Sequence, residues 1–157
     1  IDGEKKIEWI QHSTGYRLLT DAEWEGVARS GFDLKYPGSL SLEDVGWFAI
    51  NSQRKTHPVA QLKSNFWGIY DLSGNVGEWV FDDYLTTPYT LDESNTLDGA
   101  VVDPIALEPP STSSFKTVRG GGWEQNEDVC QVTSRESARP THQRHHIGLR
   151  VTRTWGV

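Results

Sequence analysis

The sequence contains almost no sulfur. Its 157 residues include one cysteine, Cys130, and no methionine. A single cysteine excludes a disulfide within the chain and a zinc site made of several thiolates. Because translation starts with methionine, a chain without one is expected to be a processed product or an internal fragment. We therefore expect an upstream segment of the same protein, or a second chain, as a partner.

Basic charge and long apolar runs are also scarce. Lysine and arginine total 15 against 22 aspartate and glutamate residues, which gives a net charge of −7. An anionic nucleic acid or membrane surface would repel such a chain, so we expect neither as a partner. No apolar stretch approaches the ~20 residues that a helix needs to span a bilayer, and the start lacks a secretory signal. The compartment stays open.

Glycine, proline and tryptophan are well represented instead. The chain has 15 glycines, 7 prolines and 7 tryptophans, while only 36% of its residues are hydrophobic. This composition indicates a loop-rich fold with an aromatic core. The length suits one domain over residues 1–157. We expect three tryptophans in apolar or glycine-rich segments to fill the core: Trp67, Trp79 and Trp123.

A helix start is clear after residue 19. In the capping box of residues 20–23, the Thr20 hydroxyl accepts from the Glu23 amide, and the Glu23 carboxylate accepts from the Thr20 amide. An apolar face at helical spacing follows, and Gly31 is placed to end the helix. That face contains Trp24, Val27 and Ala28.

The rest of the chain predicts short strands and long loops. Residues 73–75 signal a turn before the apolar stretch 76–80. Residues 147–152 alternate in polarity and predict one strand. The proline-rich stretch 84–114 predicts a long surface loop. The pattern as a whole indicates an α+β fold with few helices.

Three segments carry motifs that one known family shows in the same order. They are residues 15–25, residues 57–59 with 65–80, and residues 118–123 with Cys130, Arg135, Pro140 and residues 147–150. These segments resemble the helix start, the central signature and the ending of the formylglycine-generating-enzyme, or sulfatase-modifying factor, family. The resemblance implies a C-type-lectin-like variant of the α+β class, loop-rich with short strands. It also implies that the N-terminal portion of the domain is missing.

Enzymes of that family oxidise a peptide cysteine to formylglycine with two cysteines that bind copper. Counting back from residues 147–150 places these positions near Glu127 and Val132, and neither is cysteine. Cys130 lies between them, but one thiolate is a poor substitute for a two-thiolate copper site. A small buried hydrophobe is the favoured interpretation of Cys130. We therefore expect a divergent, non-catalytic binding or accessory module.

Three alternatives stay open. An oxygen-dependent oxidoreductase of formylglycine-generating or iron-dependent sulfoxide-synthase type would use copper or iron, with Cys130 as its catalytic candidate. Some relatives are ligand-binding proteins diversified by retroelements, whose variable asparagine codons cannot become glutamate or glutamine. The glutamate and glutamine residues where variation would be expected therefore disfavour that alternative: Glu124, Gln125, Glu136 and Gln143. A structural domain inside a larger chain, for example one attached to a kinase, is the third.

The C-terminal segment 124–146 is the expected ligand face, for a protein or a small molecule. Its histidines have loose metal spacing and no carboxylate nearby in sequence, so a solvated loop is favoured over a metal site. With its arginines they form a patch that could hold a carboxylate or phosphate, more tightly below about pH 6.5. The candidate residues are Glu124, Arg139, His142, Arg144, His145 and His146.

The turn at residues 73–78 is a candidate site for a structural calcium ion. Calcium takes oxygen ligands from side chains and carbonyls. Asn75 and Glu78 offer side-chain oxygens, Gly74 and Val76 offer carbonyls, and family members are similar in carrying calcium at this loop. The alternative is a structural turn in which Asn75 and Glu78 bond backbone amides.

Overall fold

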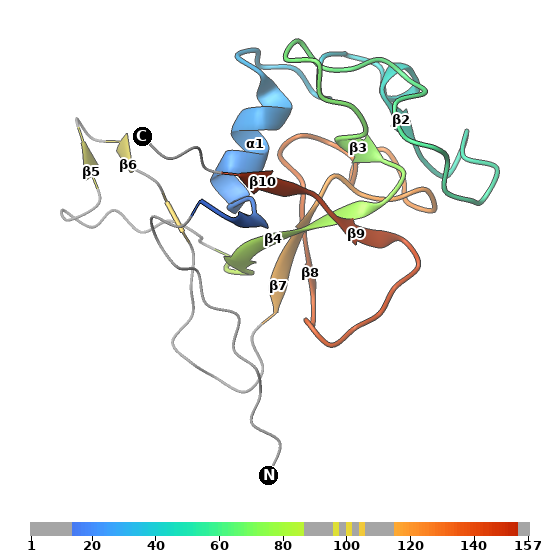
Figure 1. The fold of residues 1–157 in the computed structure, drawn as a ribbon. Helices are drawn as coiled ribbons and strands as arrows, with labels where there is room; N and C mark the ends of the chain where they lie inside the picture. The colour runs from blue at the N-terminus through green and yellow to red at the C-terminus, as the bar shows by residue number, and fades with distance from the viewer. Residues whose placement is uncertain (1–13, 87–95, 98–99, 102–103, 106–114, 154–157) are drawn as a thin grey trace.

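The computed structural model describes residues 14–86, 96–97, 100–101, 104–105 and 115–153, and their fold is α+β as predicted (Figure 1). The helices are α1 (Asp21–Arg29) and the short 3-10 helix η1 (Leu42–Asp44). The strands are β1 (Tyr16–Leu18), β2 (Gly46–Trp47), β3 (Ser73–Gly74), β4 (Gly77–Asp83), β5 (Thr96–Leu97), β6 (Ala100–Val101), β7 (Lys116–Arg119), β8 (Arg135–Ala138), β9 (Ile147–Leu149) and β10 (Val151–Arg153). Among the described residues, no helix is long and apolar enough to cross a membrane.

Most of the predicted surface loop at 84–114 lies outside the described residues. Within that stretch, β5 and β6 pair antiparallel, with Thr96 opposite Val101.

Helix α1 begins where its capping box predicts. The Glu23 amide donates to Thr20 Oγ1 at 3.1 Å, and the Thr20 amide donates to Glu23 Oε2 at 2.9 Å. The helix ends at Arg29, and its C-cap residue Ser30 lies in the left-handed region at φ 46°, one residue before the predicted Gly31. Trp24 and Ala28 are 1% and 0% exposed, so the predicted apolar face is buried. Local signals were sufficient for this element.

The described residues form two buried core clusters. The first joins α1 to the strands and contains Leu19, Trp24, Ala28, Leu72, Val80 and Val132. The second contains Tyr36, Leu42, Val45, Phe48 and Cys130. The expectation that Trp67 fills the core is wrong, because this side chain is 61% exposed. Trp79 and Trp123 are half-buried.

The exposure of Trp67 follows from a turn centred on Asn65. Asn65 Oδ1 accepts from the amides of Trp67 and Ile69 at 3.1 and 3.0 Å. Gly68 completes the turn with a positive φ of 76°. The turn therefore uses Asn65, 4% exposed, as its buried anchor and leaves the tryptophan at the surface.

The main sheet has four strands in the order β8-β7-β4-β9. Strand β4 pairs antiparallel with β7 and parallel with β9, and β7 pairs antiparallel with β8. In this register Glu78 lies opposite Arg119, the last residue of β7, while Gly77 lies opposite Ile147, the first residue of β9. The loop that follows β7 and the loop that precedes β9 therefore meet at the start of β4 (Figure 1).

The prediction of a single strand over residues 147–152 is wrong, because the structure has two strands there. Strand β9 pairs with β4, whereas β10 pairs with β1 in a separate two-stranded sheet. Arg150 lies at the break and bonds the Glu78 carboxylate through Nε and Nη2 at 2.6–3.1 Å. Its Nη2 also donates to the carbonyls of Tyr70 and Asp71. These contacts hold Arg150 in place and separate the two strands. The alternation of polar and apolar residues in the sequence does not reveal them.

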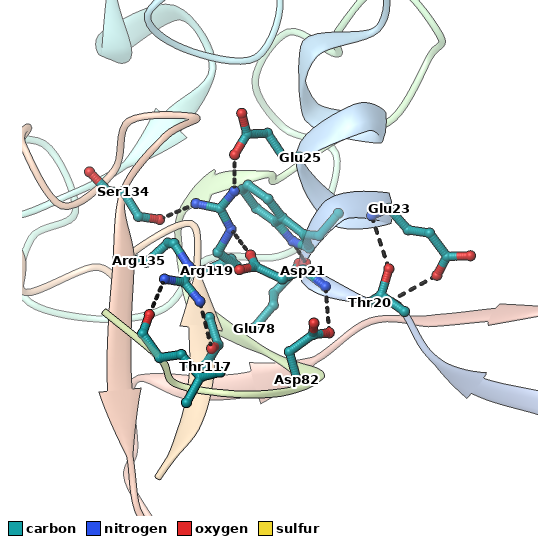
Figure 2. Close-up of polar contacts among 12 residues, drawn as sticks. Thr20, Asp21, Glu23, Glu25, Glu78, Asp82, Thr117, Arg119, Ser134 and Arg135 are labelled. Atoms are coloured by element: carbon teal, nitrogen blue, oxygen red, sulfur yellow. Dashed lines mark hydrogen bonds and ion pairs between the residues drawn. The ribbon is translucent and has the colours of Figure 1, made fainter. Parts of the chain in front are cut away.

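A buried network of ion pairs joins α1 to β7 and β8 (Figure 2). Arg119, 1% exposed, pairs with Asp21 at 2.7 Å and with Glu25 at 2.5 Å. It also donates to the Ser134 carbonyl. Arg135 pairs with the second oxygen of Asp21 at 2.6 Å. Two guanidinium groups thus face two carboxylates, which compensates charges that would be costly to bury alone.

Candidate functional site

The C-terminal face, made of residues 123–126 and 139–146, is assembled on the backbone that leads into β4, at Asn75 and Gly77. The loop after β7 carries Trp123 and Glu124, and the loop before β9 carries His146. The Trp123 amide donates to the Asn75 carbonyl at 3.0 Å, and the Gly77 amide donates to the His146 carbonyl at 2.7 Å. Hydrogen bonds to one short stretch of backbone therefore hold the two loops next to each other.

Glu124, His145 and His146 form a cluster on this face. Glu124 Oε2 lies 3.2 Å from His145 Nε2, and Glu124 Oε1 lies 2.7 Å from His146 Nδ1. One ligand atom from each residue lies within 4.8 Å of the other two. The side chains are 38%, 69% and 12% exposed, respectively. A carboxylate and two imidazoles therefore converge at a point that solvent reaches over His145.

Aromatic contacts and close packing position the cluster. The His145 ring stands edge-on to the His146 ring, at a centroid distance of 5.2 Å, and lies 5.5 Å from the Trp123 ring. At Gly122, a Cβ would lie 3.2 Å from His146 Cβ, so a glycine lets the two loops approach closely. The Gln125 side chain accepts from the Gly122 amide at 2.6 Å, which fixes the loop beside Glu124.

The structure brings together three of the six predicted ligand-binding residues. The other three, Arg139, His142 and Arg144, are exposed in the segment between β8 and β9. The Arg139 guanidinium lies 5.5 Å from the Phe115 ring centroid. The predicted anion-binding patch stays a prediction for these three residues. At His145 and His146 the neighbouring Glu124 carboxylate would repel an anion.

An open depression adjoins the loop that carries Glu124. Its volume is about 340 Å³, and it is lined by Phe48, Ala49, Ile50, Asn126, Glu127 and Asp128. The Ala49 amide donates to the Gln125 carbonyl at 3.0 Å, which joins its two walls. The loop at residues 124–128 therefore borders both the cluster and a hollow in the surface.

A family model described as the sulfatase-modifying factor enzyme 1-like domain matches residues 3–155. The chain belongs to this family. The resemblance seen in the three sequence segments is therefore confirmed, as is the C-type-lectin-like variant of the α+β class that it implied.

Several curated relatives of the sulfatase-modifying-factor domain share about 30% of its residues. The Paenibacillus barcinonensis chaperone protein LppX is 29% identical over 151 residues, covering 81% of this chain and 46% of that protein. The Chlamydia trachomatis serine/threonine-protein kinase Pkn1 is 31% identical over 146 residues, covering 92% and 22%. The Streptomyces coelicolor formylglycine-generating enzyme is 30% identical over 154 residues, covering 87% and 46%. The chain thus spans half the length of these relatives or less.

Solved structures show the same fold. The Treponema denticola variable protein 1 superimposes with a TM-score of 0.74 at 31% identity, covering 92% of this chain and 49% of that chain. PvdO from Pseudomonas aeruginosa superimposes with a TM-score of 0.67 at 27% identity, covering 89% and 53%. Both likenesses cover nearly all of the sulfatase-modifying-factor domain and about half of the other protein.

The thiol of this sulfatase-modifying-factor domain lies in the core. Cys130 is 0% exposed, and burial raises the pKa of its thiol from 9.0 to about 12. At the two positions predicted for the family's cysteines, Glu127 is exposed and Val132 is buried. Copper(I) binds thiolates, and this chain offers one protonated thiol. The residues do not fit the copper site that the family resemblance implied.

Cys130 is expected to resist alkylation in the folded protein, because its thiol is both buried and protonated. Intact-mass measurement after iodoacetamide treatment should show no adduct at neutral pH, and one adduct in guanidinium. Because the folded state keeps the Cys130 thiol protonated, the free energy of unfolding is unaffected by this group below pH 9. It decreases as the pH rises from 9 toward 12, where the thiol of the unfolded chain ionises first. Rapid labelling under native conditions would contradict this burial.

The turn predicted to hold calcium already uses its side-chain oxygens within the protein. Asn75 Oδ1 accepts from the His57 amide at 3.0 Å, and Asn75 Nδ2 donates to the His57 carbonyl. Glu78 Oε2 accepts from the Trp24 indole at 2.8 Å, and Arg150 bonds both Glu78 oxygens. A calcium ion would have to displace these donors. The contacts favour the structural alternative at this turn, and the calcium ion stays a prediction.

The two backbone positions of that predicted site determine the path of the chain. Gly74 has a positive φ of 68°, and a Cβ there would lie 2.1 Å from the Trp47 carbonyl oxygen, so a glycine is required. Val76 is half-buried, and its Cγ2 lies 3.1 Å from where a Cβ on Gly148 would be. Gly74 allows β3 to approach β2 closely, and Val76 packs where the turn approaches Gly148 of β9.

Proposed function

We propose that this domain is a divergent, non-catalytic member of its family that acts as a binding or accessory module through its C-terminal face. Residues 123–126 and 139–146 make up that face. The observation that carries the proposal is the burial of Cys130, with its thiol pKa raised to about 12. This is the only cysteine of the chain, so a pair of reactive thiolates cannot form within it.

The relatives support an accessory role. The segments that match this chain cover 22% of a protein named as a serine/threonine kinase, and 46% each of a chaperone and a formylglycine-generating enzyme. A fold that accompanies such different activities does not by itself assign one of them. The function of this chain is therefore inferred from its own side chains.

The chemistry of the face suits a polar protein segment or a small molecule. Glu124 and Arg144 offer opposite charges at the surface, and His145 adds an exposed ring. The half-buried Trp123 ring lies beside them. The net charge of −7 disfavours a nucleic acid on this or any other face.

A peptide-oxidation assay tests the non-catalytic proposal. The purified chain, supplied with copper(I), oxygen and a cysteine-containing sulfatase-type peptide, is expected to leave the peptide cysteine unchanged in mass spectrometry. A formylglycine-generating enzyme serves as the positive control, and Cys130→Ser is the matched variant. Copper-dependent formation of the peptide aldehyde that is lost in Cys130→Ser would overturn the proposal.

A further inference from the structure

We propose that Glu124, His145 and His146 bind one divalent transition-metal ion of the zinc or iron(II) class on the C-terminal face. The inference deepens the proposed function, because it assigns a cofactor to the same binding surface. Two imidazole nitrogens and one carboxylate oxygen are a ligand set that first-row transition metals prefer. Calcium and magnesium take oxygen ligands instead.

The distances within the cluster suit one small ion. In a tetrahedral zinc site with bonds of about 2.0–2.1 Å, neighbouring ligand atoms lie roughly 3.4 Å apart. The Glu124 oxygens lie 3.2 and 2.7 Å from the nitrogens of His145 and His146, and all three ligand atoms lie within 4.8 Å of one another. The Oε1–Nδ1 distance of 2.7 Å is shorter than that spacing, so one ion would bind all three atoms after the exposed Glu124 and His145 side chains rotate.

A second observation comes from His146. Its side chain is 12% exposed, and its Nδ1 atom is buried without a hydrogen bond of acceptable geometry among the described residues. Glu124 Oε1 nevertheless lies 2.7 Å from this nitrogen. Buried polar atoms in folded proteins have partners as a rule. A metal ion bound to both groups would supply that partner once the Glu124 carboxylate moves away from the ring, since a separation of 2.7 Å leaves no room for an ion between them.

The backbone beneath the cluster is fixed by hydrogen bonds. Trp123, next to Glu124, donates from its amide to Asn75 and accepts at its carbonyl from Ser52 Oγ at 2.8 Å. The His146 carbonyl accepts from Gly77 at 2.7 Å. A site whose ligands stand on a rigid frame loses little freedom when the ion binds. The exposed His145 is the ligand with most room to adjust.

Three protein ligands leave at least one coordination position open to water or to a ligand atom. That position faces solvent, since His145 is 69% exposed. The ion would therefore bind a donor atom of the partner, such as a carboxylate oxygen or an imidazole nitrogen. This places the strongest single contact of the binding face at the meeting point of its two loops.

Calorimetric titration of zinc chloride into the untagged, EDTA-treated chain at neutral pH tests the site. We expect about one zinc ion per chain, and binding at least about tenfold weaker in each of Glu124→Gln, His145→Ala and His146→Ala. His142→Ala is the matched control, since it removes an exposed histidine of the same loop that lies outside the cluster. We expect this variant to bind zinc like the wild type. Circular dichroism confirms that each variant is folded.

Absence of zinc binding by the folded wild-type chain would overturn the inference and would leave a histidine–glutamate ion pair. Binding that is lost in His142→Ala and kept in His146→Ala would overturn it as well. The peptide-oxidation assay and the zinc titration test separate proposals, so either proposal can fail while the other stands. If zinc binds and the peptide is also oxidised, the metal site stands and the non-catalytic proposal falls. If neither occurs, the non-catalytic proposal stands without the ion.

Discussion

Replacing Arg119 with leucine is expected to lower the free energy of unfolding by about 3–5 kcal/mol. The arginine is 1% exposed and pairs with Asp21, itself 2% exposed, and with Glu25. Leucine fills part of the volume but leaves Asp21 with less compensating charge inside the protein. It also removes the donor to the Ser134 carbonyl. Urea denaturation of the two proteins measures the difference.

An exposed ion pair provides the control for this measurement. Lys63 lies 3.2 Å from Asp44, with side chains 72% and 41% exposed. Because solvent screens such a pair, Lys63→Ala should cost less than about 1 kcal/mol. Arg119→Lys should remain destabilised, since one ammonium group cannot match the geometry of a guanidinium that contacts two carboxylates. A loss below about 1 kcal/mol for Arg119→Leu would contradict the role of the network.

Glu78→Ala is expected to lower the free energy of unfolding by about 3 kcal/mol, also in the presence of EDTA. The carboxylate is 5% exposed and accepts from the Trp24 indole of α1 and from Arg150 at the break between β9 and β10. Its removal leaves a buried indole N–H without its acceptor and a partly buried guanidinium with only the Tyr70 and Asp71 carbonyls. The side-chain link that joins α1, β4 and Arg150 is then lost. Thermal and urea denaturation give the loss.

The same variant tests the calcium ion predicted at the turn. If the main role of Glu78 is to pair with Arg150, its replacement costs as much in EDTA as in calcium, and calcium does not raise the melting temperature of the wild type. Glu43→Ala, which removes an exposed glutamate of η1, controls for non-specific charge effects. A loss that arises only when calcium is present would instead make Glu78 a calcium ligand.

Five of the residues in the family motifs belong to the buried polar framework. Asp21 and Glu25 lie in the first motif segment, Glu78 in the second, and Arg119 and Arg150 in the third. In the structure these residues join α1, β4, β7 and the start of β10 through ion pairs. The motifs therefore predicted the fold correctly, because they encode its internal contacts. They carried little information about the C-terminal face.

The candidate metal site could not be predicted from spacing. Glu124 is separated from His145 by 21 residues, and the two meet because β7 and β9 both pair with β4. In the sequence alone no carboxylate lies near His142, His145 and His146, so the residue pattern favours a solvated loop. The exposure of Trp67 could not be predicted either, since it depends on the side-chain hydrogen bonds of Asn65. Helix α1 was predictable because its signals lie within a few residues of one another.

A crystal structure of the chain grown with zinc chloride, with anomalous difference maps at the zinc edge, would show whether the C-terminal face holds a metal ion. We expect one strong peak bonded to Glu124, His145 and His146, with zinc–nitrogen distances of about 2.0–2.1 Å. A map with no peak between these side chains, or with zinc bound elsewhere while Glu124 pairs only with the two histidines, would contradict this expectation.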